Sequence, residues 1–463
     1  MIGLQMATES YGPCGADAAL AQENFYFQKN RPTRKRTWNT HWAVVLFLVG
    51  LCVPWIIPIG PLNLSIYGLV LLTFLLPCLS KWIRGAPGGI SLPEFGLFFY
   101  CIWAGIALLA AHGFVAIQTV GILFIETMGA YLLARCFIRN AADFRGMVLV
   151  VTTVVLALSP FAIYEWITGG KPILWALSAV SPTVEVTMMT PRWGFWRVQG
   201  PFSHSIEFGL FCTSILAMTH LAWGHNRSLS SRWLLTAAVA GTAILSMSSA
   251  PISCLLFQIM LIGYNSLLWR YRSRWTILWS IVIVGFLVVQ LGSNHGAIKF
   301  FISHFTFDPG TGWWRLAIWD FGTDSVLNHP LLGIGLTNWQ RPRWMYSASV
   351  DSFWLVTAMR YGLPAVVLLL GSCIWIMLAI ARAKSADRTV EICRLAYLIC
   401  MTTFLFVGST IHFAHAIYAW FMFALGSGAW LLDTKRPGMA RVPKAIHLQK
   451  IAYCARQRPL TES

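Results

Sequence analysis

Residues 146–167 read GMVLVVTTVVLALSPFAIYEWI, an apolar run in which Glu165 is the single charged residue. A transmembrane helix needs about 20 consecutive, mostly apolar residues, and this run has that length. Runs of similar length recur along the chain, which is 57% hydrophobic and only 11% charged. An average soluble domain has roughly 25% charged residues, so a soluble globule is excluded, and a transmembrane barrel would need alternating polarity. The pattern predicts an all-α, polytopic integral membrane protein.

We expect about twelve transmembrane helices within a domain of residues 42–432, between an N-terminal tail (1–41) and a C-terminal tail (433–463). The N-terminal tail is polar and basic without an obvious cleavage site of small residues, so we interpret the first helix as retained. A re-entrant pair is an alternative at SMSSAP (246–251). The predicted helices cover residues 42–58, 63–82, 92–111, 115–134, 146–167, 204–223, 233–249, 251–269, 275–292, 351–381, 395–411 and 413–432.

The net charge of +17 does not indicate nucleic-acid binding, because the basic residues lie between apolar runs and in the tails. With the N-terminus inside, all but 8 of the 34 lysines and arginines fall on the cytoplasmic side. The positive-inside rule predicts this bias. An even number of helices then places both termini in the cytoplasm.

Two predicted outer loops, residues 168–203 and 293–350, are too long to be simple connectors. All eight outer cations lie in or beside these loops, whereas the short outer turns contain none. Scarce cations gathered in two loops indicate an anionic ligand on the outer face. These cations are Lys171, Arg192, Arg197, Lys299, Arg315, Arg341, Arg343 and Arg360.

The second loop contains GWWRLAIWDFG (312–322), in which one arginine stands among three tryptophans. Residues 312 to about 327 are expected to form an amphipathic helix on the membrane surface, with Thr311 as N-cap. On such a helix Arg315 and Trp319 share one face. The apolar side chains of Trp314, Ile318 and Phe321 share another.

From Arg315 the chain reads RLAIWDFGTDSVLNHPLLGIGLTNW, and from Asp351 it reads DSFWLVTAMRYGLPAV. These motifs resemble the O-antigen ligase and O-antigen polymerase superfamily. A third stretch, WRVQGPFSHSIEFG (196–209), is similar to the family motif that follows the first outer loop, with Ser205 in place of a proline. A fourth, YLLARCFIRNAADFRG (131–146), resembles a cytoplasmic junction of exopolysaccharide polymerases. Asp351 occupies the position where ligases of this superfamily carry histidine.

The resemblance implies a GT-C-like membrane glycosyltransferase in the bacterial inner membrane. Such enzymes take a glycan from an undecaprenyl-pyrophosphate carrier at the periplasmic face, where no nucleotide sugar is available. The aspartate at position 351 favours a polymerase over a ligase that transfers glycan to lipid A core or to protein. From a different class, a transporter of the lipid-linked glycan is an alternative, although internal repeats and midplane charges between two halves, which it would need, are not evident.

The candidate catalytic residues are Arg315, Arg197 and Asp351. Guanidinium groups stay charged and bind phosphate oxygens in pairs, so the two arginines are expected to hold the pyrophosphate, unless they only extend toward headgroups. Asp351 is expected to take the proton of the acceptor hydroxyl, unless it only caps a helix. His204 and His329 are candidate substrate-binding residues, although His329 can instead bond to backbone in its turn. The other candidate substrate-binding residues are Trp319, Arg341 and Arg343.

Buried carboxylates in the apolar segments are costly unless they are paired, which applies to Glu126, Glu165 and Glu207. The eleven cysteines show no pairwise pattern, so we expect neither disulfides nor a metal cluster. No phosphate-binding or dinucleotide motif is present, and we expect no cofactor. The expected partners are the lipid-linked oligosaccharide, the membrane and a co-polymerase that regulates chain length; nucleic acid is not expected.

Overall fold

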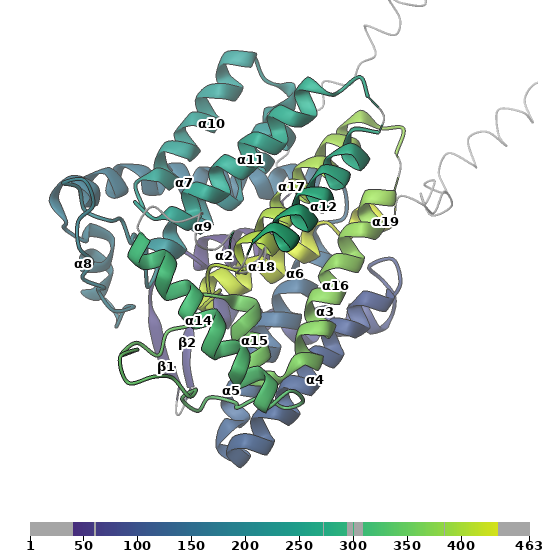
Figure 1. Cartoon of the computed structure of the whole chain (residues 1–463). Helices are drawn as coiled ribbons and strands as arrows, with labels where there is room; N and C mark the ends of the chain where they lie inside the picture. The colour runs from purple at the N-terminus through teal and green to yellow at the C-terminus, as the bar shows by residue number, and fades with distance from the viewer. Residues whose placement is uncertain are drawn as a thin grey trace, which may run out of the picture. The chain divides into compact units, whose positions relative to one another are not determined.

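The computed structural model describes residues 40–59, 62–271, 273–293, 300, 309–383 and 385–433, which are mostly helical (Figure 1). Within these residues, nine helical segments are long and apolar enough to cross a membrane. The prediction of a polytopic helical membrane protein is therefore confirmed. The nine segments are Ile66–Ile83, Leu92–Phe137, Ala141–Thr168, Ser205–Trp223, Ser249–Leu267, Arg274–Gly292, Leu363–Arg382, Arg388–Val407 and His415–Asp433.

Each of the twelve predicted segments contains helix, and the difference from nine candidate spans has three sources. Helix α2 (Trp42–Gly50) has only nine residues, and α10 (Leu229–Ile244) has sixteen. The third and fourth predicted helices form one continuous segment, in which α4 (Leu92–His112) passes into a 3-10 turn (Gly113–Ala116) and α5 (Ile117–Phe124). Gly113 has a φ of 64°, a value that favours glycine, and here α4 and α5 turn back on each other.

The prediction of a helix over residues 42–58 is wrong beyond Gly50. Strand β1 (Ile56–Ile59) pairs in antiparallel register with β2 (Leu62–Ser65), so the described residues also contain a small two-stranded sheet. Proline cannot donate a backbone hydrogen bond, and β-branched residues favour strands, so Pro54, Pro58 and three isoleucines direct this apolar run away from helix. Hydrophobicity alone does not distinguish a helix from a strand in this stretch.

The remaining helices follow the predicted order with shifted ends. Helix α3 runs over Ile66–Ile83; after α5 come a π-helical turn (Ile125–Gly129), α6 (Ala130–Phe137) and α7 (Ala141–Thr168). Helix α9 (Ser205–Ser214) continues into a π-helical turn (Met218–Trp223) and a 3-10 turn (Gly224–Asn226). The others are α11 (Ser249–Leu267), α12 (Arg274–Gly292), α16 (Leu363–Arg382), α17 (Arg388–Val407), α18 (His415–Ser427) and α19 (Trp430–Asp433).

The core of the bundle is built around α18, which packs along α6 and also contacts α9 and α17 (Figure 1). Its residues from Ile417 to Ser427 are all buried, and Trp420 is fully enclosed. At one end of the bundle the Arg135 side chain bridges Glu94 and Asp433, with both N–O distances 3.0 Å. Tyr131 and Trp82 also donate to Glu94, so this buried carboxylate is fully paired.

Both long loops contain helix. The first contains α8 (Pro172–Ser178), and the second contains α14 (Pro309–Asn328). Helix α14 begins three residues before the predicted start, so the prediction of Thr311 as N-cap is wrong; proline is favoured in the first turn because its missing N–H would be unbonded there. The predicted helix over 351–381 is divided at Gly362 into α15 (Phe353–Tyr361) and α16.

A turn at residues 329–335 fixes this division. Its backbone bonds to the end of α15, because the Ile334 N–H donates to the Met359 carbonyl at 2.7 Å and the Gly335 N–H donates to the Arg360 carbonyl at 3.1 Å. Gly333, Gly335 and Gly362 all have positive φ values. Gly333 and Gly335 therefore serve the geometry of this turn. The turn and α15 together hold α14 through a second apolar cluster that includes Ile318, Leu355 and Met359.

We predict that Gly362→Ala destabilises the protein, because the added Cβ would lie 1.8 Å from the Leu331 carbonyl oxygen at a φ of 81°. Backbone strain of this kind costs about 1–3 kcal/mol before the clash is counted. Thermal unfolding of the purified protein in detergent measures the effect. Gly371→Ala, in open space on α16, is the matched control and should leave the midpoint unchanged or slightly higher. Equal unfolding midpoints for the two variants would show that the backbone at position 362 does not require glycine.

Candidate functional site

The first long loop is anchored by a buried carboxylate at the end of α7. The Glu165 side chain accepts from the backbone N–H of Gln199 at 2.6 Å and of Gly200 at 3.1 Å, and it pairs with the buried Lys171 ammonium. The expectation that Glu165 requires a partner is met by this arrangement. Lys171 consequently serves the loop structure, because its charge is already neutralised.

Two arginines of this loop are held at the junction of α10 and α11. Arg192 opens a tight turn in which Trp193 and Gly194 both have positive φ, and its Nη1 donates to the Met247 carbonyl at 2.8 Å. The Nη2 atom of Arg197 donates to Ser248 Oγ at 3.0 Å. The SMSSAP segment therefore positions both guanidinium groups.

Arg197 retains unused hydrogen-bonding capacity. Its Nε is buried and has no hydrogen-bond partner among the described residues. Burial, followed by the positive charge of Arg192, lowers the pKa of Arg197 to about 10. The side chain still carries its charge at neutral pH, and an arriving anion would satisfy a donor that is now unbonded.

His204 adjoins this pair as the N-cap of α9, where its Nδ1 accepts from the Ile206 N–H at 3.2 Å. Burial lowers the pKa of His204 to about 4, with further contributions from Arg197, Arg192 and Lys171. The imidazole is therefore neutral at neutral pH. Because Nδ1 accepts, the ring proton is assigned to Nε2, which is free to donate to a ligand.

Arg315 of the second loop is buried in the first half of α14, with 4% of its surface exposed. Its Nε and Nη1 atoms have no hydrogen-bond partner among the described residues. Burial lowers the pKa of Arg315, the nearby Asp351 carboxylate raises it, and Arg192 lowers it. The charge of Arg192 in the first loop thus acts on both Arg197 and Arg315.

Asp351 lies beside Arg315 just before α15. The N-cap of that helix is Ser352, whose side chain accepts from the Leu355 N–H, so the alternative of Asp351 as a helix cap is excluded. Burial raises the pKa of Asp351, while Arg315 and a hydrogen bond from Ser349 Oγ at 3.4 Å oppose this effect. A half-buried carboxylate with a raised pKa is better suited to accept a proton than a solvated one.

Among the other predicted residues, His329 lies apart from this group. His329 is exposed beyond the C-terminal end of α14, and fourteen residues of helical rise separate it from Arg315 by about 20 Å. Trp319 is half-buried and packs against the second apolar cluster. Trp314 and Phe321 both contact Trp344, with ring centroids 5.9 and 6.0 Å apart, so the prediction that these two share a face is supported.

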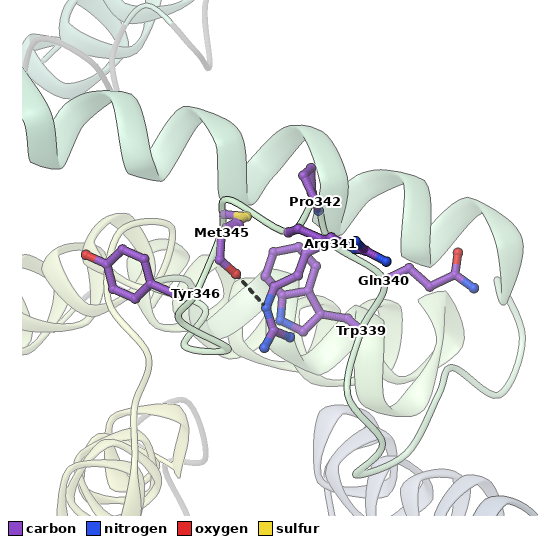
Figure 2. Close-up of a pocket in the computed structure, with 7 residues that line it drawn as sticks. Trp339, Gln340, Arg341, Pro342, Met345 and Tyr346 are labelled. Carbon is purple, nitrogen blue, oxygen red and sulfur yellow. Dashed lines mark hydrogen bonds between the residues drawn. The ribbon is translucent and has the colours of Figure 1, made fainter.

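Arg341 and Arg343 line a shallow hollow of about 390 Å³ in the second loop, together with Trp339 and Tyr346 (Figure 2). Arg341 Nε donates to the Met345 carbonyl at 2.9 Å. Elsewhere in the described part of the chain, no group of three or more His, Cys, Asp or Glu side chains is arranged to hold a metal ion. Lys299 lies outside the described residues.

Sequence reasoning missed the role of Arg192 and the presence of His412. Arg192 was recognised only as one of the outer cations, although its position directly before the aromatic run WGFW (193–196) was a usable signal. His412 lies in the connection between α17 and α18, next to Ile411, whose carbonyl accepts from the Phe353 N–H at 2.9 Å. Its Nδ1 is buried without a partner among the described residues, and burial, then Arg360 and His415, lower its pKa to about 4.

Part of this chain is similar to one known protein family. Residues 234–370 match the model of a family described as O-antigen ligase. The match runs from α10 into α16 and includes Arg315, the 329–335 turn and Asp351, whereas Arg192 and Arg197 precede it. A comparison with curated proteins found no match.

Proposed function

We propose that this chain is a polysaccharide polymerase of the O-antigen ligase and polymerase superfamily, and the match of residues 234–370 supports this proposal. It joins oligosaccharide repeats that are carried on undecaprenyl pyrophosphate. The observation that carries the proposal is Arg315, a buried guanidinium group whose Nε and Nη1 have no hydrogen-bond partner among the described residues and which the Asp351 carboxylate influences electrostatically.

The donor is held by arginines from both loops. A lipid pyrophosphate has two phosphates, and Arg315 and Arg197 each have buried N–H groups that phosphate oxygens can accept from. Arg192 adds a third positive charge close to both. Preorganised cations stabilise the negative charge that develops on the leaving group, which is typically among the larger catalytic contributions. The neutral His204 donates to the same ligand through Nε2.

Asp351 completes the transfer step. The acceptor hydroxyl oxygen attacks the anomeric carbon of the donor sugar, and the bond from that carbon to the phosphate oxygen breaks. The hydroxyl proton passes to the Asp351 carboxylate, and the bond's electron pair leaves with undecaprenyl pyrophosphate. The products are one longer lipid-linked glycan and one free lipid pyrophosphate, so the reaction needs neither a metal nor a redox cofactor in this scheme.

Asp351 also favours a polymerase over a ligase, because it stands where ligases of this superfamily carry histidine. A ligase onto lipid A core would use the same arginines and differ in its acceptor. In the proposed arrangement both loops face the periplasm, the helices lie in the bacterial inner membrane, and both termini are cytoplasmic. A co-polymerase that regulates chain length is a further proposed partner.

We predict that Arg315→Ala abolishes polymer and that lipid-linked single repeats accumulate, because the pyrophosphate loses its buried cation. Gel analysis of glycans from a deletion strain that expresses each variant measures the outcome, with protein amounts checked by immunoblot. Arg382→Ala removes an exposed arginine at the end of α16 and is the matched control, which should keep full-length polymer.

Full-length polymer from the Arg315 variant at normal expression would contradict the proposed function. The deletion strain itself separates the two enzymes. Loss of all long chains indicates a polymerase, whereas long chains retained on the lipid carrier indicate a ligase.

The activity is predicted to depend on pH through the ionisation of Asp351. Asp351 acts as a base only when ionised, so the raised pKa makes activity fall at a higher pH than an ordinary aspartate, with pKa about 3.9, would give. Ser349→Ala removes a donor to the carboxylate and should move this acidic limb of kcat/KM upward by roughly half a pH unit. Asp351→Asn should be inactive throughout. An unchanged limb in the Ser349 variant would show that another group accepts the proton.

A further inference from the structure

The hollow formed by residues 339–346 lies on the second loop, near the start of α14. Figure 2 shows the Arg341 side chain in front of the Trp339 ring, held by its bond to the Met345 carbonyl, with Tyr346 beyond Met345. The Arg341 guanidinium carbon is 5.8 Å from the Trp339 ring centroid. This contact leaves the outer edge of the guanidinium group available to a ligand.

Among the described residues, no ion pair neutralises the positive charge of the hollow. Residues 331–350 contain two arginines and no aspartate or glutamate. In the described part of the chain, neither Arg341 nor Arg343 forms an ion pair, and the exposed Arg343 forms no hydrogen bond. Two unpaired guanidinium groups beside each other favour an anionic ligand.

An aromatic surface adjoins the hollow and leads toward Arg315. Trp313 contacts Trp344 at 5.1 Å and Trp314 contacts Tyr346 at 5.2 Å between ring centroids. Trp313, Trp344 and Tyr346 remain 54%, 48% and 82% exposed. Amphipathic rings of this kind can cover the apolar faces of sugar rings. Trp313 and Trp314 precede Arg315 on α14, so the aromatic surface lies within one helical turn of the proposed donor site.

We propose that this surface binds the glycan part of the substrate and that the repeat unit contains an acidic sugar whose carboxylate pairs with Arg341 and Arg343. The inference rests on the proposed polymerase function and names its substrate class. Aromatic stacking alone would serve a neutral glycan. The two unpaired arginines favour an acidic glycan over a neutral one, because a planar guanidinium group binds a carboxylate through two parallel hydrogen bonds.

The test measures binding of a soluble oligosaccharide of glucuronic acid to the purified full-length protein in nanodiscs of zwitterionic lipid. The same oligosaccharide with its carboxyl groups reduced is the neutral probe. We expect the acidic probe to bind at least tenfold more tightly than the neutral one, and Arg343→Ala to weaken it about fivefold or more. Arg343 contacts no other described group through a hydrogen bond, so this variant should fold normally.

Arg270→Ala is the matched control, because Arg270 lies over Trp269 at 5.7 Å in another loop. It should leave binding unchanged. Equal affinity for the acidic and reduced probes, or unchanged affinity in the Arg343 variant, would overturn the inference. Vesicles of phosphatidylglycerol provide the remaining arm: if Arg343→Ala weakens vesicle binding but not oligosaccharide binding, the arginines contact lipid headgroups and the inference fails.

The soluble probe lacks pyrophosphate, so its binding does not depend on the transfer chemistry. If the acidic probe fails to bind selectively while Arg315→Ala still abolishes polymer, only the acidic-sugar inference fails. If polymer persists in the Arg315 variant, the proposed function fails whatever the probe does.

Discussion

The burial of the Arg315 guanidinium group is the constraint on which the site depends. A cation removed from water costs several kcal/mol unless other groups compensate it, and here the Asp351 carboxylate offsets the effect of burial only in part. The two residues come from separate segments, and the packing of α14 on α15 holds them together. That packing in turn requires the glycine-rich turn at 329–335 and the break at Gly362. The backbone conformation of this turn and of the break at Gly362 thus fixes the position of the partly compensated Arg315 charge.

The first loop adds positive charge to the same place. Arg192 acts on Arg315, Arg197 and His204, and burial is the main cause that lowers the pKa of each. Neighbouring cations lower these pKa values further, whereas at Arg315 the Asp351 carboxylate opposes the effect more strongly than Arg192 adds to it. Such a cluster is unfavourable without a ligand, and a diphosphate would relieve both the repulsion and the unbonded N–H groups. Glu165 and Lys171 form a buried ion pair that anchors the first loop. They therefore help to position these arginines without competing for the diphosphate.

Much of the fold follows from the sequence because apolar runs near spanning length are hard to satisfy in any other way. The exceptions are local: residues 51–58 are as apolar as a helix but contain two prolines and β-branched residues, and they form part of a hairpin instead. The candidate arginines and Asp351 were identified from charge and motif. Which of Asp351 and Ser352 caps α15 depends on the residue at which that helix begins, and the effect of Arg192 on Arg315 depends on tertiary packing. Neither was accessible from the sequence.

The central claim is that Arg315 binds the pyrophosphate of a lipid carrier. Its most direct measurement is equilibrium binding of undecaprenyl pyrophosphate to the purified protein in nanodiscs, compared with the Arg315→Gln variant. Loss of a charged hydrogen-bond donor should weaken binding tenfold or more, since such bonds contribute roughly 1.5–3 kcal/mol. Equal affinity of the two proteins for the lipid pyrophosphate would contradict the account.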